Sequence, residues 1–310
     1  MSTAPAAAPV EAPDPAPAAT PADLRDAVGQ WYSEHARDLP WRAADRTPWG
    51  VLVSEVMLQQ TPVVRVEPAW RAWMARWPTP AALAAAATAD VLRAWGRLGY
   101  PRRALRLQDC ARAIVERHDG EVPRGEDVLR ELPGVGEYTA AAVTAFAHGR
   151  RAVVVDTNVR RVLARAIGGT ALPGPTYTAA ERRRAVATAP LSDEAAVRWA
   201  CASMELGALV CTARAPRCDA CPLRTRCAWQ LAGRPADEHA ARRRTQTWAG
   251  TDRQVRGRVM GALRERESPL ARADVEALWH DASQLDRCLA SLVLDGLVAT
   301  DGAGGYALPA

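Results

Sequence analysis

The sequence predicts an all-α protein of two helical domains, followed by a small C-terminal winged-helix-like module. From residue 24 to about residue 230, apolar residues recur at helical spacing in segments as long as the helices of compact α domains. Only Val153 to Val155 resembles a strand, and it is too short to need a sheet. With 48% apolar residues and no apolar run near the length of a membrane span, the 310 residues suit a globular protein.

The first 22 residues are almost entirely alanine, proline, threonine and acidic residues. Because this segment lacks a basic start and a leucine-rich centre, it predicts a disordered tail and no signal peptide. We therefore expect a cytoplasmic protein that makes no membrane contact. An amphipathic helix follows from Leu24 and ends at Leu39-Pro40.

Further helices follow in order along the chain. Residues 49–60 read as a nearly all-apolar helix with one carboxylate, Glu55, and Pro62 begins a helix rich in tryptophan. Segments at 80–87, 89–96, 101–118 and 126–132 continue a six-helix domain with a helix-hairpin-helix, which we place at residues 47–150. Residues 23–46 and 151–232 make up the second, cysteine-bearing helical domain.

A glycine turn leads into the last helix of the six-helix domain. Pro133-Gly134-Val135-Gly136 feeds directly into an alanine-rich helix, which leaves backbone N–H groups exposed on a loop without bulky side chains. A phosphate oxygen can approach those N–H groups and gains from the positive end of the helix. Gly134 and Gly136 therefore predict a backbone clamp for nucleic acid.

The C-terminal part begins with a change of composition. Residues 233–251 are rich in proline, acidic residues and arginine, which predicts a solvated linker. Residues 252–310 contain three helical patterns, at 252–266, 271–278 and 283–296, and then two short apolar stretches around a glycine-rich turn. Three helices and a hairpin are typical of a winged helix, which either binds DNA or packs against a neighbour.

All forty basic residues are arginine, because the sequence contains no lysine, and the formal net charge is +5. An arginine-rich surface suits phosphate contacts, although proteins that never touch DNA also carry such a charge. Biased codon usage is enough to explain the absence of lysine. Whatever the cause, the chain has no side-chain primary amine.

Four of the seven cysteines share one short loop with the spacing Cys-x6-Cys-x2-Cys-x5-Cys: Cys211, Cys218, Cys221 and Cys227. An odd number of cysteines without a secretion signal argues against a disulfide framework, and four thiolates on one loop can converge on one centre. A zinc ribbon usually supplies two separated cysteine pairs, and this loop contains one. The spacing therefore favours an iron–sulfur cluster over zinc.

Two carboxylates are candidates for catalysis. Glu55 has apolar neighbours on both sides; a surface glutamate paired with arginine is the ordinary alternative, but little polar face remains for it. Apolar surroundings favour the acid form of a carboxyl group. Asp156 precedes a helix, where an ordinary N-cap is the alternative, and a helix N-terminus keeps a carboxylate ionised. One protonated and one ionised carboxyl group suit the cleavage of a glycosidic bond.

Several dispersed motifs occur in one order along residues 24–230. They are Leu39-Pro40-Trp41-Arg42, Ser54 to Thr61, Leu98-Gly99-Tyr100, Leu132 to Gly136, Asp156 to Val162 and the four cysteines. Together they resemble the adenine-specific mismatch DNA glycosylases, which belong to the helix-hairpin-helix superfamily with endonuclease-III-type glycosylases. The resemblance implies a fold of two α domains with double-stranded DNA held between them, and removal of adenine mispaired with 8-oxoguanine.

The resemblance also implies roles for individual residues. Glu55 matches the acid that protonates the adenine ring, and Asp156 matches the carboxylate that stabilises the sugar cation, with Asn158 in support. Tyr138 stands where bifunctional relatives carry a Schiff-base lysine. Contacts to substrate or DNA are implied for Trp41, Arg42, Gln60 and Tyr100, and coordination of a [4Fe–4S] cluster for Cys211, Cys218, Cys221 and Cys227.

The chain departs from many family members, which carry a second tyrosine where it has Pro101 and a Nudix-like domain where it has the winged-helix-like module. We expect a monomeric, monofunctional glycosylase for A:8-oxoguanine or A:G mispairs. One alternative is an endonuclease-III-type glycosylase and lyase for oxidised pyrimidines, which needs an amine nucleophile. Another is a non-catalytic iron–sulfur DNA-binding regulator, which has no need of Glu55.

Overall fold

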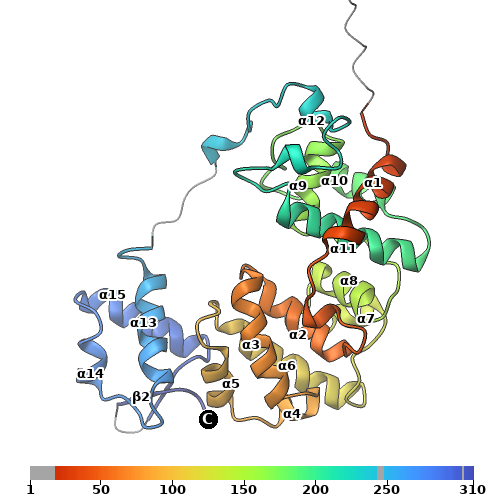
Figure 1. The fold of residues 1–310 in the computed structure, drawn as a ribbon. Helices are drawn as coiled ribbons and strands as arrows, with labels where there is room; N and C mark the ends of the chain where they lie inside the picture. The colour runs from red at the N-terminus through yellow and green to blue at the C-terminus, as the bar shows by residue number, and fades with distance from the viewer. Residues whose placement is uncertain (1–17, 243–247, 302–303) are drawn as a thin grey trace, which may run out of the picture. The chain divides into compact units, whose positions relative to one another are not determined.

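The computed structural model describes residues 18–242, 248–301 and 304–310 (Figure 1). Most of the tail predicted at residues 1–22, and part of the linker predicted at 233–251, lie outside the described residues. Contacts group the described residues into two compact units. Unit 1 contains residues 18–36, 155–190 and 198–242, and unit 2 contains residues 37–154, 191–197, 248–301 and 304–310.

Unit 2 contains the helices predicted between residues 47 and 150. They are α2 (Pro48–Leu58), α3 (Val63–Arg76), α4 (Pro80–Ala84), α5 (Thr88–Trp95), α6 (Arg102–Arg117), α7 (Glu126–Arg130) and α8 (Glu137–Phe146), preceded by the 3₁₀ turn η1 (Pro40–Arg42). The sequence pattern located each of these helices to within a few residues. Their mainly helical composition confirms the predicted fold class.

Helix α2 is the central helix of unit 2. It is apolar on every side, and its residues from Trp49 to Met57 are all buried. The helix starts at Pro48 because the Thr47 hydroxyl accepts a hydrogen bond from the N–H of Gly50 and proline suits the first turn. A helix buried on all sides gives any polar side chain on it a fixed position.

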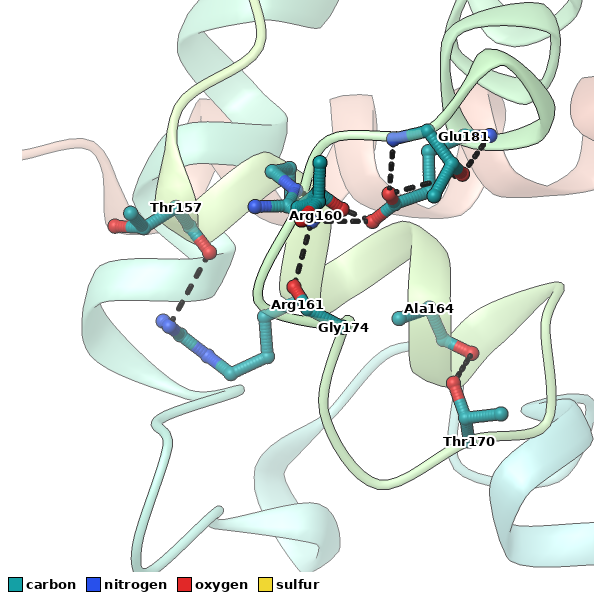
Figure 2. Close-up of polar contacts among 9 residues, drawn as sticks. Thr157, Arg160, Arg161, Ala164, Thr170, Gly174 and Glu181 are labelled. Carbon is teal, nitrogen blue, oxygen red and sulfur yellow. Dashed lines mark hydrogen bonds and ion pairs between the residues drawn. The ribbon is translucent and has the colours of Figure 1, made fainter. Parts of the chain in front are cut away.

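Unit 1 is built from helices of the N-terminal and middle parts of the chain. They are α1 (Pro21–His35), α9 (Thr157–Ala166), α10 (Ala179–Thr188), α12 (Ala228–Leu231) and most of α11 (Asp193–Leu209), with the 3₁₀ turns η2 (Cys218–Ala220) and η3 (Ala240–Arg242). Helix α1 begins before Leu24 because Thr20 and Asp23 form a capping box ahead of it. Arg160 of α9 reaches Glu181 of α10 at 2.8 Å and joins these helices (Figure 2).

The C-terminal module has the predicted three helices and hairpin: α13 (Asp252–Arg264), α14 (Arg272–Glu276), α15 (Ala282–Leu294), β1 (Ala299–Thr300) and β2 (Tyr306–Ala307). The two strands pair antiparallel, with Ala299 opposite Ala307. In the described part of the chain no other strand occurs, and residues 153–155 have an irregular conformation. None of the described helices has both the length and the apolar character needed to cross a membrane.

The module shares its core with the rest of unit 2. Apolar residues of α13 and α15, such as Val259 and Leu289, belong to the same buried cluster as Trp95 of α5. Polar contacts reinforce the junction: Arg264 donates to the carbonyl of Leu92 at 3.0 Å, and the carbonyl of Arg266 accepts from Arg93 at 3.0 Å. The sequence left open whether this module packs against a neighbour, and the structure packs it on α5. The domain boundaries predicted from the sequence stay a prediction.

Candidate active site and cysteine loop

Glu55 lies on the buried helix α2 and is 4% exposed. Its Oε2 accepts a hydrogen bond from the hydroxyl of Tyr138, 3.0 Å away, on α8. The alternative that Glu55 is an ordinary surface glutamate does not agree with this burial. The contact joins two of the predicted site residues, which are 83 positions apart in the sequence.

The loop that follows α2 and the loop that precedes α6 both carry unusual backbone. Gln60 has a φ of 56° and Tyr100 a φ of 48°, in the left-handed region that side chains other than glycine rarely adopt. Such strain persists only where the surroundings hold it, and it is common at binding sites. Gln60 and Tyr100 are both predicted DNA contacts, so the strain coincides with the residues that the sequence singled out.

Arg103 bridges these two loops. Its guanidinium donates to the carbonyls of Val56 and Met57 at 2.8 and 3.1 Å, and to the carbonyl of Gly99 at 3.1 Å. It also reaches the hydroxyl of Thr61 at 3.0 Å. Burial lowers the pKa of Arg103 to about 10. Arg103 could not be singled out from the sequence, because an arginine in the first turn of an amphipathic helix normally faces solvent.

The glycine turn packs against the side chain of Arg106 on α6. Gly134 has a φ of 79°, and a Cβ atom there would lie 2.9 Å from the Cβ of Arg106, so only glycine fits. Gly136 caps α8 without a side-chain hydrogen bond. The turn borders a shallow cavity that Arg103, Arg106 and Gln59 also line. The glycine turn and two arginines of α6 therefore line the same cavity in unit 2.

Trp41 and Arg42 lie in the turn η1. Trp41 is buried and packs edge-to-face on Trp70 of α3, with ring centroids 5.7 Å apart. Arg42 is half-buried. The position of Trp41 shows a core contact, and the predicted role of this pair in a base pocket stays a prediction.

Asp156 is the N-cap of α9 in unit 1. Its Oδ1 accepts from the backbone N–H groups of Asn158 and Val159 at 2.8 and 2.7 Å, and its Oδ2 accepts from the Nδ2 of Asn158 at 2.6 Å. All of these partners donate, which favours the carboxylate form. Burial nevertheless raises the pKa of Asp156 above its ordinary value, against the lowering effect of these donors and of Arg161. The sequence predicted an ionised Asp156 from its place at a helix N-terminus. That prediction did not include the burial of the carboxyl group, which raises its pKa.

A chain of hydrogen bonds continues from Asp156 toward the cysteine loop. Arg161, which is buried, donates to the Oδ1 of Asn158 at 2.7 Å and to the carbonyl of Cys211 at 2.6 Å. It also reaches the carbonyl of Thr157 in its own helix, whereas its neighbour Arg160 reaches Gly174 and Glu181 (Figure 2). The asparagine amide thus links the candidate catalytic carboxylate to a candidate metal ligand.

Gly207 of α11 makes this chain possible. A Cβ at Gly207 would lie 2.6 Å from the Cβ of Asn158, and the Gly207 carbonyl accepts from Arg161 at 2.8 Å. Helix α11 can therefore approach α9 only through a residue without a side chain. Neither Gly207 nor Arg161 was predicted from the sequence. Gly207 meets Asn158, and Arg161 meets Gly207 and Cys211, only because the fold brings together residues that are far apart in the sequence.

The four cysteines lie where α11 ends, in η2 and at the start of α12. Burial, together with charge at Cys211, Cys227 and Cys218, raises the pKa of the Cys221 thiol to about 12. Among the described residues, no three metal-binding side chains are close enough to hold a single ion. Four cysteine thiolates from one loop are the donor set of a [4Fe–4S] cluster, so the residues present fit such a group.

Arg165 supports the cysteine loop from α9. It is 3% exposed, and its Nη1 lies 3.4 Å from the Sγ of Cys211, while its guanidinium stacks on the ring of Trp229 at 4.7 Å. Two arginines of the loop pair with carboxylates: Arg224 with Asp219 at 3.0 Å, and Arg226 with Asp23 at 2.6 Å.

Comparison with known proteins gives consistent matches. The model of the HhH-GPD superfamily of base excision DNA repair proteins matches residues 53–188. An adenine DNA glycosylase of Mycobacterium tuberculosis is 52% identical over 280 residues, which cover 90% of this chain and 91% of the relative.

Two solved structures share the fold. A thermostable thymine-DNA glycosylase superposes with a TM-score of 0.62 at 25% identity, over 68% of this chain and 97% of that one. A non-covalent endonuclease III–DNA complex superposes with a TM-score of 0.58 at 25% identity, over 70% of this chain and 98% of that one. These similarities cover both units.

Proposed function

This chain belongs to the adenine DNA glycosylases of the HhH-GPD superfamily of base excision DNA repair proteins, and we propose that it hydrolyses the N-glycosidic bond of adenine mispaired with 8-oxoguanine or guanine. Enzymes of this kind are hydrolases that act in base excision repair. Because the target atom is inaccessible inside a duplex, the adenine must first be flipped out of its stack.

The observation that carries the proposal is the buried Glu55 with its hydrogen bond from Tyr138. Glu55 is the proton donor: protonation of a ring nitrogen turns adenine into a neutral leaving group as the bond to the sugar breaks. The Tyr138 hydroxyl orients the carboxyl group through its 3.0 Å hydrogen bond. Burying a carboxyl group costs stability, which favours a functional role for Glu55.

Asp156 supplies a negative charge beside the sugar. As the base leaves, positive charge develops on the sugar, and a nearby carboxylate stabilises it. The donors of Asn158 and Val159 hold this carboxylate in one orientation. Water completes the hydrolysis.

The remaining site residues bind the DNA. Backbone N–H groups at Gly134 and Gly136 donate hydrogen bonds to a phosphate, Gln60 enters the gap left by the flipped adenine, and Tyr100 contacts the duplex beside it. Trp41 and Arg42 contribute to the adenine pocket. Support comes from the left-handed backbone at Gln60 and Tyr100, which Arg103 holds together.

The lyase alternative is disfavoured by composition. A glycosylase that also cleaves the strand uses an amine to form a Schiff base, and this sequence contains no lysine. Tyr138 stands at the position where the resemblance implies that amine in bifunctional relatives, and a phenol forms no imine.

Proteins of this family and their endonuclease III neighbours are typically iron–sulfur proteins. Cys211, Cys218, Cys221 and Cys227 would hold a [4Fe–4S] cluster in this chain. When bound, the cluster would fix the loop against α9 through Arg161 and Arg165, which contact Cys211.

A single-turnover assay tests the proposal. Duplexes with A:8-oxoguanine, A:G and A:T pairs are incubated with excess protein, and released adenine and strand breaks are measured separately. We expect adenine release from the two mispairs without strand cleavage. Covalent capture by borohydride together with efficient nicking would contradict a monofunctional enzyme and favour the lyase.

A further inference from the structure

The first turn of α13 lies beside the Tyr100 loop. The guanidinium carbon of Arg253 is 4.7 Å from the ring centroid of Tyr100 and 5.9 Å from that of Trp248, and Arg253 also donates to the Tyr100 hydroxyl. Arg103 faces the same tyrosine ring at 5.7 Å. We name these four side chains, Arg103, Tyr100, Arg253 and Trp248, the Tyr100 stack.

The Tyr100 stack is open to solvent. Trp248 is 55% exposed and Tyr100 is 42% exposed. Large aromatic side chains gain most when they are buried, so two exposed rings together indicate a surface that a ligand covers. Alternating rings and guanidinium groups are the side chains that proteins use to stack on bases and sugars and to bind phosphates.

The charge around the stack favours an anionic ligand. Arg65, whose guanidinium reaches the carbonyl of Arg97, lies against the same loop. Asp252, the acid next to Arg253, is bound by Arg287 at 2.9 Å and by Gln284 at 2.9 Å. The Asp252 carboxylate therefore has two partners other than Arg253.

The stack is continuous with the proposed DNA contacts. Arg103 binds the backbone of both the Gln60 loop and the Tyr100 loop. The junction between the module and α5 places α13 in a defined position, because Arg264 and Arg93 make hydrogen bonds across it. A duplex that reaches Gln60 and Tyr100 therefore also meets Arg253.

We propose that the C-terminal module is a second DNA-binding element of this enzyme. Arg253 contacts a phosphate of the bound duplex beside the mispair, and the exposed rings of Trp248 and Tyr100 pack against the adjoining sugar or base. The inference deepens the proposed function, on which it rests for the identity of the duplex. It assigns the module a role in substrate binding that a purely structural appendage would not have.

The test measures binding without chemistry. The full-length protein is titrated against a fluorescent duplex that carries a non-hydrolysable adenine analogue opposite 8-oxoguanine, at several salt concentrations. Arg253→Ala should raise Kd about tenfold and reduce the slope of log Kd against log salt by about 1. Trp248→Ala should raise Kd by a similar factor and leave the slope unchanged.

Arg266→Ala is the matched control. It removes the same charge just past the other end of α13, roughly 20 Å away along the helix. If Arg253→Ala weakens binding no more than this control does, the inference is wrong. Arg253→Lys guards against misfolding: it keeps the charge and loses the planar stack, so Kd should rise while the salt slope stays at the wild-type value. A wild-type Kd and slope in both Arg253 variants would also overturn the inference.

The outcome is separable from that of the proposed function. Adenine release by the wild-type protein tests the function, whereas these titrations compare variants on an unreactive duplex. A protein that released adenine normally but bound equally well with and without Arg253 would retain its function and lose only this second DNA-binding element.

Discussion

The hydroxyl of Tyr138 donates to Glu55 across 3.0 Å, so the helix that follows the glycine turn holds the buried carboxyl group of the central helix α2. This contact couples two parts of the proposed site. A phosphate bound at the turn and a base presented to Glu55 would be positioned by the same helix, α8. Substitutions of Glu55 and of Tyr138 test this coupling.

Replacing Glu55 by Gln should abolish adenine release and leave duplex binding intact. The amide keeps the shape of the side chain and cannot deliver a proton, so the single-turnover rate should fall on the order of 10³-fold. Glu116→Gln, on the exposed surface of α6, is the control and should behave as wild type. Retained excision by Glu55→Gln would favour a non-catalytic DNA-binding regulator.

Replacing Tyr138 by Phe should slow excision without weakening duplex binding. The phenyl ring preserves the packing of α8 and removes the hydrogen bond to Glu55. The loss of one such bond to an ionisable group predicts a fall of about tenfold in the single-turnover rate. An unchanged rate would show that Tyr138 only packs against Glu55.

The excision rate should depend on pH through Asp156. The catalytic form is the carboxylate, so the rate falls as the pH falls through the pKa of this group. Because burial raises that pKa, the fall should begin at a higher pH than it would for a solvent-exposed aspartate. A pH–rate profile of single turnovers on an A:8-oxoguanine duplex measures this limb.

Asn158→Ala should move the acid limb farther toward neutral pH. The Nδ2 of Asn158 donates to Asp156 and lowers its pKa, so its removal raises the pKa again. Thr157→Ala, in the same turn of α9, keeps the donors to the carboxylate and serves as the control. Superimposable profiles for wild type and Asn158→Ala would contradict the assignment of this limb to Asp156.

Replacing Gly207 by Ala should damage both stability and activity. The added methyl group would lie 2.6 Å from the Cβ of Asn158, which forces α9 and α11 apart. We expect a loss of about 1–3 kcal/mol in the free energy of unfolding and a slower excision rate. Gly261→Ala, where no atom lies within 4 Å, should instead gain up to about 1 kcal/mol from helix propensity. Denaturant titration checks both variants.

Replacing Arg103 by Lys should weaken duplex binding and slow excision together. An ammonium group offers three donors and cannot span both loops as the guanidinium fork does, so Gln60 and Tyr100 lose their common support. We expect a change of about tenfold in Kd. Arg112→Lys, on the same helix, is the control. Equal Kd values for the two variants would show that Arg103 does not position these two loops for DNA binding.

The helices and the candidate catalytic residues were predictable because they leave local signals. Glu55 stood out as one carboxylate in an apolar helix, and Asp156 preceded a helix as an N-cap does. The structure shows that Asp156 is indeed the N-cap of α9, with the Asn158 amide as a further partner. The roles of these residues in catalysis stay predictions.

The arginines that organise the site were not predictable. Arg103, Arg161 and Arg253 act through partners 3 to 153 positions away, and in the sequence each resembles an ordinary solvated arginine on a helix. The packing of the module was also hidden. The apolar stripe of α13 looks the same whether it covers α15 alone or α5 as well, so only the tertiary contacts decide between them.

The hydrogen bond from Arg264 to Leu92 spans 172 positions, and this has a consequence for biosynthesis. A ribosome that adds 5 to 20 residues per second leaves the outer face of α5 uncovered for about 10 to 30 seconds before its partner emerges. During that interval the nascent chain exposes apolar surface, so efficient production should depend on a chaperone that shields α5 until translation nears completion.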